Sequence, residues 1–419
     1  MSGPLDHIKV VEMALAIQGP AAGLYLRDMG ADVIKVEPPL GDMSRYFRGV
    51  NNNLPNEAVG SQFIAMNRGK KSVCLDIHTP LGREAVKRML KEADVFLSNY
   101  RESALSRMGL GYEDAKALNP KLIYATVNGY GPQGPQADKS MFDGAAIARA
   151  GLASVTGAPD GSPIAPGATV ADTAGAMQLA LGIVTALVSR AQTGNGQRVQ
   201  TSALGAQLWL QMWELSHVWL TGELLERSGP HHANMPGPYG FYETASGDHF
   251  LFAAAQTNEA WDAFWIFVDD PIESINPKWN LPIKRFGQGV TGQAAEEIRE
   301  KMVAAFKSKT TPEWIEFLGG QPDIVYEKVQ NYDEVRVDAQ ALANDYIESI
   351  EVAHAGKTSI VGNLMTFSET PSSTRGGPSD LGAATEATLA ALGFSAAEIK
   401  SVVDHADSER ATAMKELGD

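Results

Sequence analysis

The chain has 419 residues, of which 44% are hydrophobic and 20% are charged, and this is the composition of a folded globular protein. Its length favours two or three domains over one. The net charge of −15 argues against a nucleic-acid partner, because binding to phosphate backbones requires a basic face. The longest apolar stretch, 174–188, is shorter than the roughly 20 residues that cross a bilayer, so we expect no membrane partner.

The cysteine content and the first residues of the chain bear on the cellular location of the protein. A single cysteine, Cys74, cannot form a disulfide within the chain, which suits a reducing environment. Residues 1–9 have no sustained apolar core of the kind found in signal peptides. We therefore expect a cytoplasmic protein.

The first half of the chain alternates β-branched runs with helical segments, which is the pattern of a parallel α/β sheet. One helix is expected at 20–30, because Pro20 suits a helix start and Gly30 a helix end, and another at 80–93. Asn99 and Asn128 end two of the strands, and open α/β sheets bind ligands at the carboxyl ends of strands. The five expected strands are 8–12, 32–37, 72–77, 94–99 and 122–128.

The remainder of the chain indicates a second domain and a return to the first. Residues 193–205 are expected to form a turn, a short strand and a helix start, and a helix rich in tryptophan follows at 207–225. A loop dense in glycine and proline at 228–240 precedes a new pattern of strands and helices. The later elements are expected at 294–307, 312–318, 349–354, 357–362, 384–393 and 395–405. The domains are expected at 1–205 (large domain, first part), 206–227 (linker helix), 228–330 (small domain) and 331–419 (linker and return to the large domain).

Asp172 lies where a segment rich in proline and glycine gives way to a long apolar helix. Its neighbours are all small, which leaves room for a bulky group to approach the carboxylate. The alternative is an ordinary helix N-cap, because Asp readily accepts hydrogen bonds from the first free N–H groups of a helix. Asp143, at the start of another helix, is open to the same two interpretations.

Three other motifs have ordinary interpretations. The sequence GYGPQG at 129–134 matches a dinucleotide-binding pattern, but proline and no helix follow it, so we interpret it as a tight turn and reject NAD. His231 and His232 have no second ligand cluster at the spacing that a metal requires, so no metal site is expected. Cys74 lies within an apolar strand, which is typical of a small core thiol.

Basic residues gather close to the ends of the expected strands. Each alone is an ordinary surface charge, but together they would suit phosphate groups, because guanidinium and ammonium groups form charge-assisted hydrogen bonds to phosphate. These residues are Arg45, Arg48, Arg68, Lys70, Lys71, Arg101 and Arg107.

Five segments of the first half, in this order, resemble the family III CoA-transferases. They are GADVIKVEPPLGD (30–42), NRGKKSVCLDIHTPLG (67–82), ADVFLSNYRESALSRMGLGY (93–112), NPKLIYATVNGYGPQGP (119–135) and the stretch around Asp172. The resemblance covers most of residues 5–205 and returns more weakly in DLGAATEATLAALGF (380–394). That family groups formyl-CoA:oxalate and carnitine CoA-transferases with the α-methylacyl-CoA racemases.

The resemblance implies an α/β fold with a Rossmann-like large domain, a parallel sheet and a smaller α/β domain. It also implies ring-shaped subunits that interlock in a homodimer. Coenzyme A would enter as acyl-CoA, a substrate rather than a permanently bound cofactor, and a carboxylic acid would accept the CoA.

The resemblance assigns the central role to Asp172, which matches the catalytic aspartate of the transferases. Such a carboxylate attacks the thioester to give a mixed anhydride and then an aspartyl-CoA thioester. The helix start is expected to stabilise the developing negative charge. Asp143 matches the acidic partner of the nucleophile, and Gln18 lies one place beyond the position of an active-site glutamine, which is Ile17 here.

The resemblance also implies contacts with CoA, but not all of the family's residues at these positions are present in this chain. Asn99, Arg107 and Leu75 match CoA-binding positions, and we expect Ala16, Arg101 and Lys139 to contribute as well. Departures from the formyl-CoA branch argue against formyl-CoA:oxalate specificity. They are Pro38, Ser140 and Phe142, which stand where that branch has Arg, Lys and Tyr.

Two alternative functions remain at this point. A racemase would share the fold and the aspartate, but it needs a basic residue where this chain has Phe142, which cannot carry a proton. A non-catalytic subunit of a heteromeric transferase is the other alternative, and the presence of Asp172 weighs against it.

Overall fold

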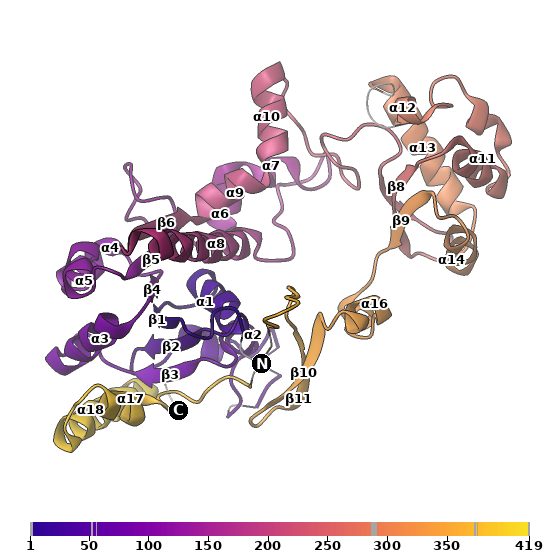
Figure 1. Cartoon of the computed structure of the whole chain (residues 1–419). Coiled ribbons are helices and arrows are strands. Elements are labelled where there is room, and N and C mark those ends of the chain that lie inside the picture. Colours follow the sequence, from indigo (N-terminus) through magenta and orange to yellow (C-terminus); the bar gives the residue numbers. More distant parts are fainter. Residues whose placement is uncertain are drawn as a thin grey trace. The chain divides into compact units, whose positions relative to one another are not determined.

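The structure, a computed structural model, describes residues 3–417 except Asn52, Asn56, 286–290, Ser373 and Arg375. The chain divides into two compact units, whose elements are labelled in Figure 1. The large unit comprises Met1–Ala150, Gly167–Leu210 and Arg336–Asp419, and the small unit comprises Gly151–Pro166 and Gln211–Val335.

The large unit is built on a sheet that has six strands among the described residues, in the order β3-β2-β1-β4-β5-β6. All neighbouring strands run parallel, which confirms the expected α/β class. The chain changes direction across the sheet between β1 and β4, which creates a topological switch point. The strands are β1 (Lys9–Met13), β2 (Asp32–Glu37), β3 (Lys71–Cys74), β4 (Val95–Ser98), β5 (Ile123–Asn128) and β6 (Arg198–Ser202).

One face of the sheet is covered by α1 (Gln18–Asp28) and α8 (Val170–Thr193), which pack against each other. Aliphatic side chains of both helices and of the sheet form this core, among them Leu26 and Ile183. Gly30 adopts a φ of 105°, a conformation that glycine adopts readily, and so ends the first helix as the sequence predicts. The helices α6 (Asp143–Ala150) and α9 (Ala203–Leu210) pack against α8.

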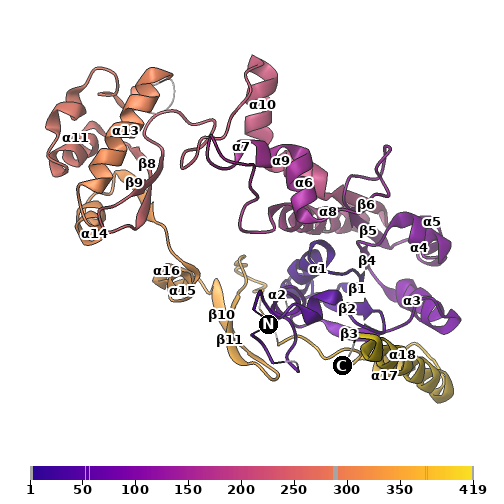
Figure 2. The same cartoon turned by 180° about the vertical axis from the view of Figure 1, so that it is seen from behind.

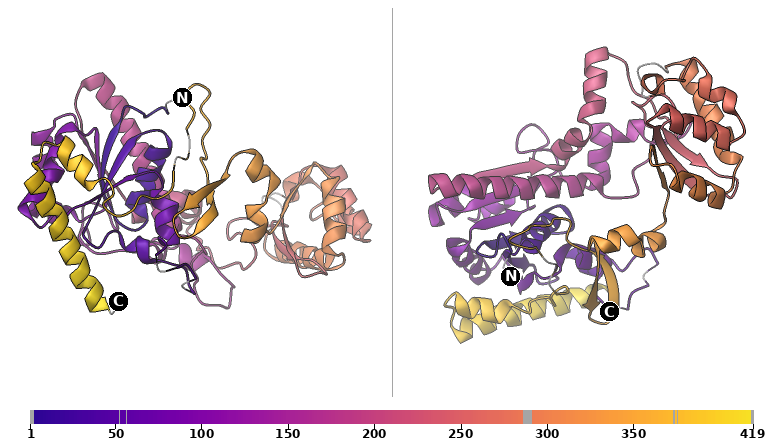
Figure 3. Two further views of the ribbon diagram at one scale, coloured as in Figure 1. Left: turned by 90° about the horizontal axis from the view of Figure 1, so that it is seen from below. Right: turned by 45° about the vertical axis from the view of Figure 1, so that its right-hand side comes forward.

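The other face is covered by helices from both ends of the chain. Helix α3 (Pro80–Glu92) begins with proline, and the Thr79 side chain caps it by accepting a hydrogen bond from the Gly82 N–H group. Helices α4 (Glu102–Arg107) and α5 (Tyr112–Leu118) follow, and α17 (Thr385–Ala391) returns to pack on β3. Figure 3 shows α18 (Ala396–Leu417) as one long helix that extends beyond its predicted end at 405.

A hairpin and several short helices complete the large unit. The strands β10 (Ile347–Val352) and β11 (Gly356–Val361) pair antiparallel and pack on α2 (Ser61–Asn67). The 3-10 helix η1 (Met43–Tyr46) follows β2, and α16 (Ala339–Ala343) precedes the hairpin. The boundary between the two units falls within the short helix α15 (Tyr332–Arg336).

Helix α8 is, by length and hydropathy, the one helix among the described residues that is able to cross a membrane. It has 24 residues, so it is longer than the apolar stretch on which the sequence expectation rests. Its buried residues pack against α1 and the sheet, as those of a core helix do.

The small unit has an antiparallel sheet in the order β7-β8-β9, made by β7 (Gly240–Glu243), β8 (His249–Ala255) and β9 (Ile324–Lys328). Figure 2 shows α11 (Asn258–Phe267), α13 (Gln293–Lys307) and α14 (Thr311–Gly319) around these strands. The core between them is rich in aromatic side chains, including Trp261, Phe306 and Trp314. Short elements η2 (Pro271–Ile275), α12 (Pro282–Arg285) and α7 (Leu152–Val155) belong to the same unit.

The structure differs from the predicted single helix at 207–225. Helix α9 ends at Leu210, Gln211 leaves the helical conformation with φ −105° and ψ 20°, and α10 (Met212–Thr221) follows. Gly222 ends α10 with a φ of 74°, which a residue with a side chain rarely adopts. The division into units falls at this break, and Gly151–Pro166, which we expected in the large domain, groups with the small unit.

Leu389 tests whether the C-terminal segment completes the large unit. Its side chain in α17 is wholly buried in the core formed with α3 and the sheet. Leu389→Ala should lower the free energy of unfolding by about 2–4 kcal/mol, because it removes buried methyl groups and leaves a cavity. Urea denaturation followed by circular dichroism measures this. Leu364→Ala, at a half-exposed position, is the control, and equal stabilities of the two variants would contradict the packing of α17.

Candidate active site

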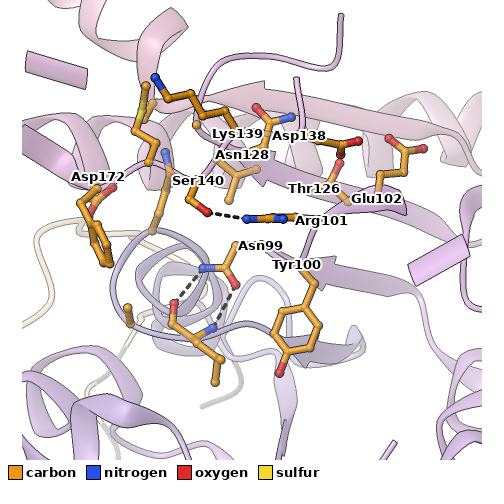
Figure 4. Close-up of a pocket in the computed structure, with 18 of the residues that line it drawn as sticks. Asn99, Tyr100, Arg101, Glu102, Thr126, Asn128, Asp138, Lys139, Ser140 and Asp172 are labelled. Carbon is orange, nitrogen blue, oxygen red and sulfur yellow. Dashed lines mark hydrogen bonds between the residues drawn. The ribbon is translucent and has the colours of Figure 1, made fainter. Parts of the chain in front are cut away.

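A cavity of about 460 Å³ lies at the carboxyl ends of β4 and β5, where parallel sheets bind ligands. In the view of Figure 4, Asp172 and Glu102 mark opposite sides of this pocket, with Asn99, Ser140 and Arg101 between them. All lining residues belong to the large unit. They are 15–18, 99–102, 126–129, Pro132, 137–142, Asp172 and Ala203.

The pocket brings together most of the residues that the sequence analysis singled out. Asp143 lies directly behind the pocket wall, in contact with the backbone of Asp172. Leu75 is wholly buried in the core and Arg107 is exposed at the end of α4, and neither lines the pocket. The predicted residues in the lining are Ala16, Gln18, Asn99, Arg101, Lys139 and Asp172.

Asp172 does not cap its helix, so the N-cap interpretation is wrong. Helix α8 begins at Val170 with Thr169 as its N-cap residue, and Asp172 stands in the first turn. The cap is supplied by Asp143, whose Oδ1 accepts hydrogen bonds from the N–H groups of Ala171 at 2.8 Å and Asp172 at 3.0 Å. One carboxylate therefore holds the helix start, and the other is left to line the pocket.

The N–H groups at the start of α8 are not available to a substrate. Asp143 occupies two of them, and those of Val170 and Thr173 donate to the carbonyls of Ala168 and Thr169. Direct hydrogen bonds from this helix start to negative charge on a substrate are therefore not available, and the expected stabilisation is limited to the helix dipole. A donor for such charge has to come from elsewhere in the pocket.

The carboxyl group of Asp172 has an unusual affinity for its proton. Burial disfavours the charged form, and the negative charge of Asp143 adds to this effect, so that the pKa of Asp172 rises to about 6. A carboxylate with a raised pKa is more basic, yet it remains ionised at neutral pH. The pair thus provides an ionised side chain of increased basicity at the pocket wall.

Gln18 is the donor that the pocket leaves unused. Its side chain is 92% buried, and its Nε2 has no hydrogen-bond partner among the described residues. Space for this amide exists because residue 175, one turn after Asp172, is glycine: a Cβ atom there would lie 2.2 Å from Nε2. Buried amides without partners are rare and costly, and they point to a ligand or to a catalytic role.

The polar groups near the pocket opening are mostly engaged with each other. Asn99 donates from Nδ2 to the Leu15 carbonyl at 2.7 Å and accepts from the Leu15 N–H group at 3.0 Å, as Figure 4 shows. The Arg101 guanidinium donates to Ser140 Oγ at 2.5 Å. Lys139 is exposed, with its ammonium 5.4 Å from the centre of the Tyr130 ring.

Comparison with known protein families matches residues 5–385 to CoA-transferase family III. The chain belongs to this family. This confirms the resemblance on which the sequence interpretation rests, and it identifies CoA transfer as the chemistry of the enzyme.

Relatives of this family III CoA-transferase support the assignment along most of its length. An acyl-CoA transferase of Fusarium pseudograminearum (strain CS3096) is 30% identical over 413 residues, which cover 95% of this chain and 86% of the relative. The succinyl-CoA:glutarate CoA-transferase of Mus musculus is 29% identical over 367 residues, covering 87% and 81% of the two chains. The crystal structure of a CAIB/BAIF family protein from Brucella suis is 26% identical with a TM-score of 0.80, covering 94% of this chain and 100% of that one.

Seven basic residues of the transferase were predicted to bind phosphate together, and this prediction is wrong for most of them. Arg45 and Lys70 are buried and paired with Glu37 and Glu12, so their charges are already compensated. Arg68 is buried against Asp28, Lys71 pairs with Asp32, and Arg48 reaches the Ala58 carbonyl. Arg101 alone of the seven lines the pocket.

The other motifs have the ordinary roles that we expected. Gly131 and Gly134 adopt φ values of 100° and 91°, as residues of tight turns do. His231 bonds to the Tyr239 carbonyl, and His232 pairs with Glu214. Cys74 is buried at the end of β3.

Sequence reasoning missed the buried charges beneath the pocket, although a signal for them exists. Glu12 and Lys35 interrupt the apolar strands β1 and β2, and a charge inside a buried parallel strand requires a partner. The two side chains pair at 3.1 Å. The contact of Gly175 with Gln18 has no such signal, because it depends on how α1 packs against α8.

Gly175→Ala should separate stability from activity. Alanine favours a helix by about 1 kcal/mol over glycine, while the added Cβ displaces only the end of the flexible Gln18 side chain. We expect an unchanged or higher melting temperature. If Gln18 donates to a developing oxyanion, kcat for CoA transfer should be at least tenfold lower, since removing one such donor costs about 10²–10³. Gly144→Ala, where the new Cβ meets open space, is the control. Full activity of Gly175→Ala would show that the position of Gln18 is unimportant.

The charge of Asp143 should set the pH dependence of the reaction. If the ionised form of Asp172 is the reactive one, kcat/KM of the wild type should fall below about pH 6. Asp143→Asn removes a negative charge but keeps an oxygen to cap α8, so the pKa of Asp172 falls and the acid limb moves to lower pH. The pH profile of kcat/KM for both proteins measures this. A limb that stays in place or moves upward would contradict the electrostatic coupling.

Proposed function

We propose that this enzyme transfers CoA from an acyl-CoA to a free carboxylic acid with Asp172 as its nucleophile. The observation that carries the proposal is the Asp172 carboxylate, which lines the pocket while Asp143 takes over the capping of its helix. Small residues surround Asp172 in the first turn of α8, and they leave access for a thioester. The raised pKa makes the carboxylate more nucleophilic than an exposed one.

The reaction proceeds through four balanced steps. The Asp172 carboxylate attacks the thioester carbonyl and expels CoA thiolate, which leaves a mixed anhydride. The thiolate attacks the aspartyl carbonyl, releasing the donor acid and forming an aspartyl-CoA thioester. The acceptor carboxylate attacks this thioester to form a second anhydride, and the returning thiolate takes the new acyl group and frees Asp172.

Each attack creates a tetrahedral oxyanion, and Gln18 is the donor that we assign to it. Its Nε2 is buried and has no partner in the described residues, so it can bond to the oxyanion without breaking another interaction. A donor of this kind acts in the transition state more than in the ground state and therefore raises kcat. Asp143 supports the nucleophile through its charge and its hold on the helix start.

We propose contacts between CoA and residues that line the pocket. Arg101 and Lys139 are exposed cations suited to the phosphate groups of CoA. Ala16 lines the pocket and is proposed to contact the pantetheine end of the substrate, and Asn99 shapes this wall by fixing Leu15. Leu75 and Arg107, which do not line the pocket, are not part of this proposal.

The acids are proposed to be dicarboxylic. The name of the mouse relative pairs succinyl-CoA with glutarate, and both succinic and glutaric acid have two carboxyl groups.

The aromatic ring of Phe142, 75% exposed, also lines the pocket. A phenyl ring offers no base for exchanging an α-proton, which favours transfer over racemisation.

A cytoplasmic homodimer with interlocked ring-shaped subunits is the proposed assembly. Its support is the exposed apolar surface of two neighbouring helices in the large unit, with Met177 and Leu181 on α8 and Trp209 on α9. In the small unit, α10 exposes Trp213 and Trp219. Patches of this composition are typical of subunit interfaces.

Asp172→Asn tests the proposed nucleophile. The amide has the shape of the carboxylate but cannot form the anhydride, so CoA transfer from succinyl-CoA to glutarate should fall more than about a thousandfold. Binding of CoA should change little. Chromatography of the CoA esters measures the reaction, with Asp138→Asn, another carboxylate of the lining, as control. Residual activity above a tenth of the wild type in Asp172→Asn would contradict the proposal.

A further inference from the structure

Ala16, in the pocket wall, has a backbone conformation that alanine rarely adopts. Its φ is 64°, in the left-handed region where the Cβ atom crowds the backbone. The other described non-glycine residues in this region are Asp269, Asp345 and His354, whose polar side chains make it more tolerable. Something outside Ala16 has to stabilise its conformation.

The group that holds Ala16 is the carboxylate of Asp42. Its Oδ1 accepts a hydrogen bond from the Ala16 N–H group at 3.1 Å and others from the N–H and hydroxyl groups of Ser44 at 3.0 and 2.7 Å. Its Oδ2 lies 2.9 Å from the ammonium group of Lys35. Asp42 has no exposed surface and does not line the pocket, so it cannot touch a substrate.

The same buried groups hold the residues before Ala16. The Lys35 ammonium donates to the Ala14 carbonyl at 2.7 Å, and Asn99 fixes both polar backbone groups of Leu15. Successive peptide groups of the pocket wall are therefore fixed by side chains from other parts of the sheet. The chain then enters α1 at Gln18, whose amide reaches Gly175 beside Asp172.

We propose that Asp42 is a positioning residue for CoA transfer, which acts by holding Ala16 in the left-handed conformation that carries the Gln18 amide into the pocket. The inference rests on the proposed function, because the conformation of Ala16 affects the reaction only through the donor that Gln18 provides beside Asp172. Without the hydrogen bond that its N–H group donates to Asp42, Ala16 would relax to negative φ and redirect the first turn of α1. The Lys35 ammonium keeps Asp42 ionised, and the negative charge of the carboxylate makes its oxygen a stronger acceptor than that of a neutral group.

A double-mutant cycle between Asp42 and Ala16 tests the proposal. Asp42→Ala should lower kcat about 10–100-fold with a smaller change in the KM for acyl-CoA, since misplacement of a catalytic group by about 1 Å can cost 10²-fold. Glycine adopts positive φ without the strain that alanine meets. In an Ala16→Gly background, Asp42→Ala should therefore lower kcat by less than a third of the factor that it causes when residue 16 is alanine. Equal factors in the two backgrounds would overturn the proposal.

Ser72→Ala and Asp42→Asn separate positioning from general destabilisation. The Ser72 hydroxyl belongs to the same buried network, where it bonds to Glu37, but it does not touch the pocket wall. Ser72→Ala should lower the melting temperature and leave kcat within twofold. Asp42→Asn keeps one oxygen for Ala16 and should retain more activity than Asp42→Ala. A kcat that follows the melting temperature across all three variants would contradict a positioning role.

Hydrogen exchange provides a readout that needs no catalytic activity. Amide exchange in the peptide containing residues 14–20, followed by mass spectrometry, should accelerate at least tenfold in Asp42→Ala and stay unchanged in Ser72→Ala. Unchanged exchange in Asp42→Ala overturns the proposal on its own. If the wild type transferred no CoA between any acids, the proposed function would fail, and the exchange measurement would still decide whether Asp42 holds this loop.

Discussion

The hydrogen bonds that the N–H groups at the start of α8 donate to Asp143 are the interaction on which the pocket wall at Asp172 depends. By accepting from the N–H groups of Ala171 and Asp172, this carboxylate satisfies the helix start and frees the Asp172 side chain for the pocket. It also occupies the donors that would otherwise stabilise an oxyanion. In the proposed mechanism the donor therefore comes from another helix. The buried Nε2 of Gln18 has no partner among the described residues, and it has room because residue 175 has no side chain.

The arrangement costs stability in return for reactivity. Burial and the Asp143 charge raise the pKa of Asp172 to about 6, so the folded protein holds this proton more tightly than the unfolded chain does. The stabilisation that this carboxyl group contributes in its protonated form is lost as the pH rises from about 4 through 6. At neutral pH the enzyme therefore carries a charge that destabilises its fold, a common property of catalytic groups. Buried pairs such as Lys35 with Asp42 keep the neighbouring backbone in place.

Much of the fold was predictable because it depends on residues that are close together in the sequence. Strands such as β2 show β-branched residues in a short run, and Gly30 ends α1 where its φ is positive. The resemblance to family III CoA-transferases named Asp172 and Gln18 as candidate site residues, and both line the pocket. The capping of α8 by Asp143 and the buried partners of Arg45 and Lys70 escaped prediction, because they depend on contacts between segments far apart in the chain. The break at Gln211 has no local signal that we recognise.

The most direct test of the account follows oxygen from the acceptor acid into the protein. In the proposed sequence the acceptor carboxylate forms an anhydride with Asp172, and the thiolate then leaves one acceptor oxygen on the aspartate. Turnover with an acceptor acid labelled with heavy oxygen, followed by proteolysis and mass spectrometry, should place the label on the carboxyl group of Asp172. A wild-type enzyme that completes many turnovers without labelling Asp172, or that labels another residue instead, would contradict the role given to this carboxylate.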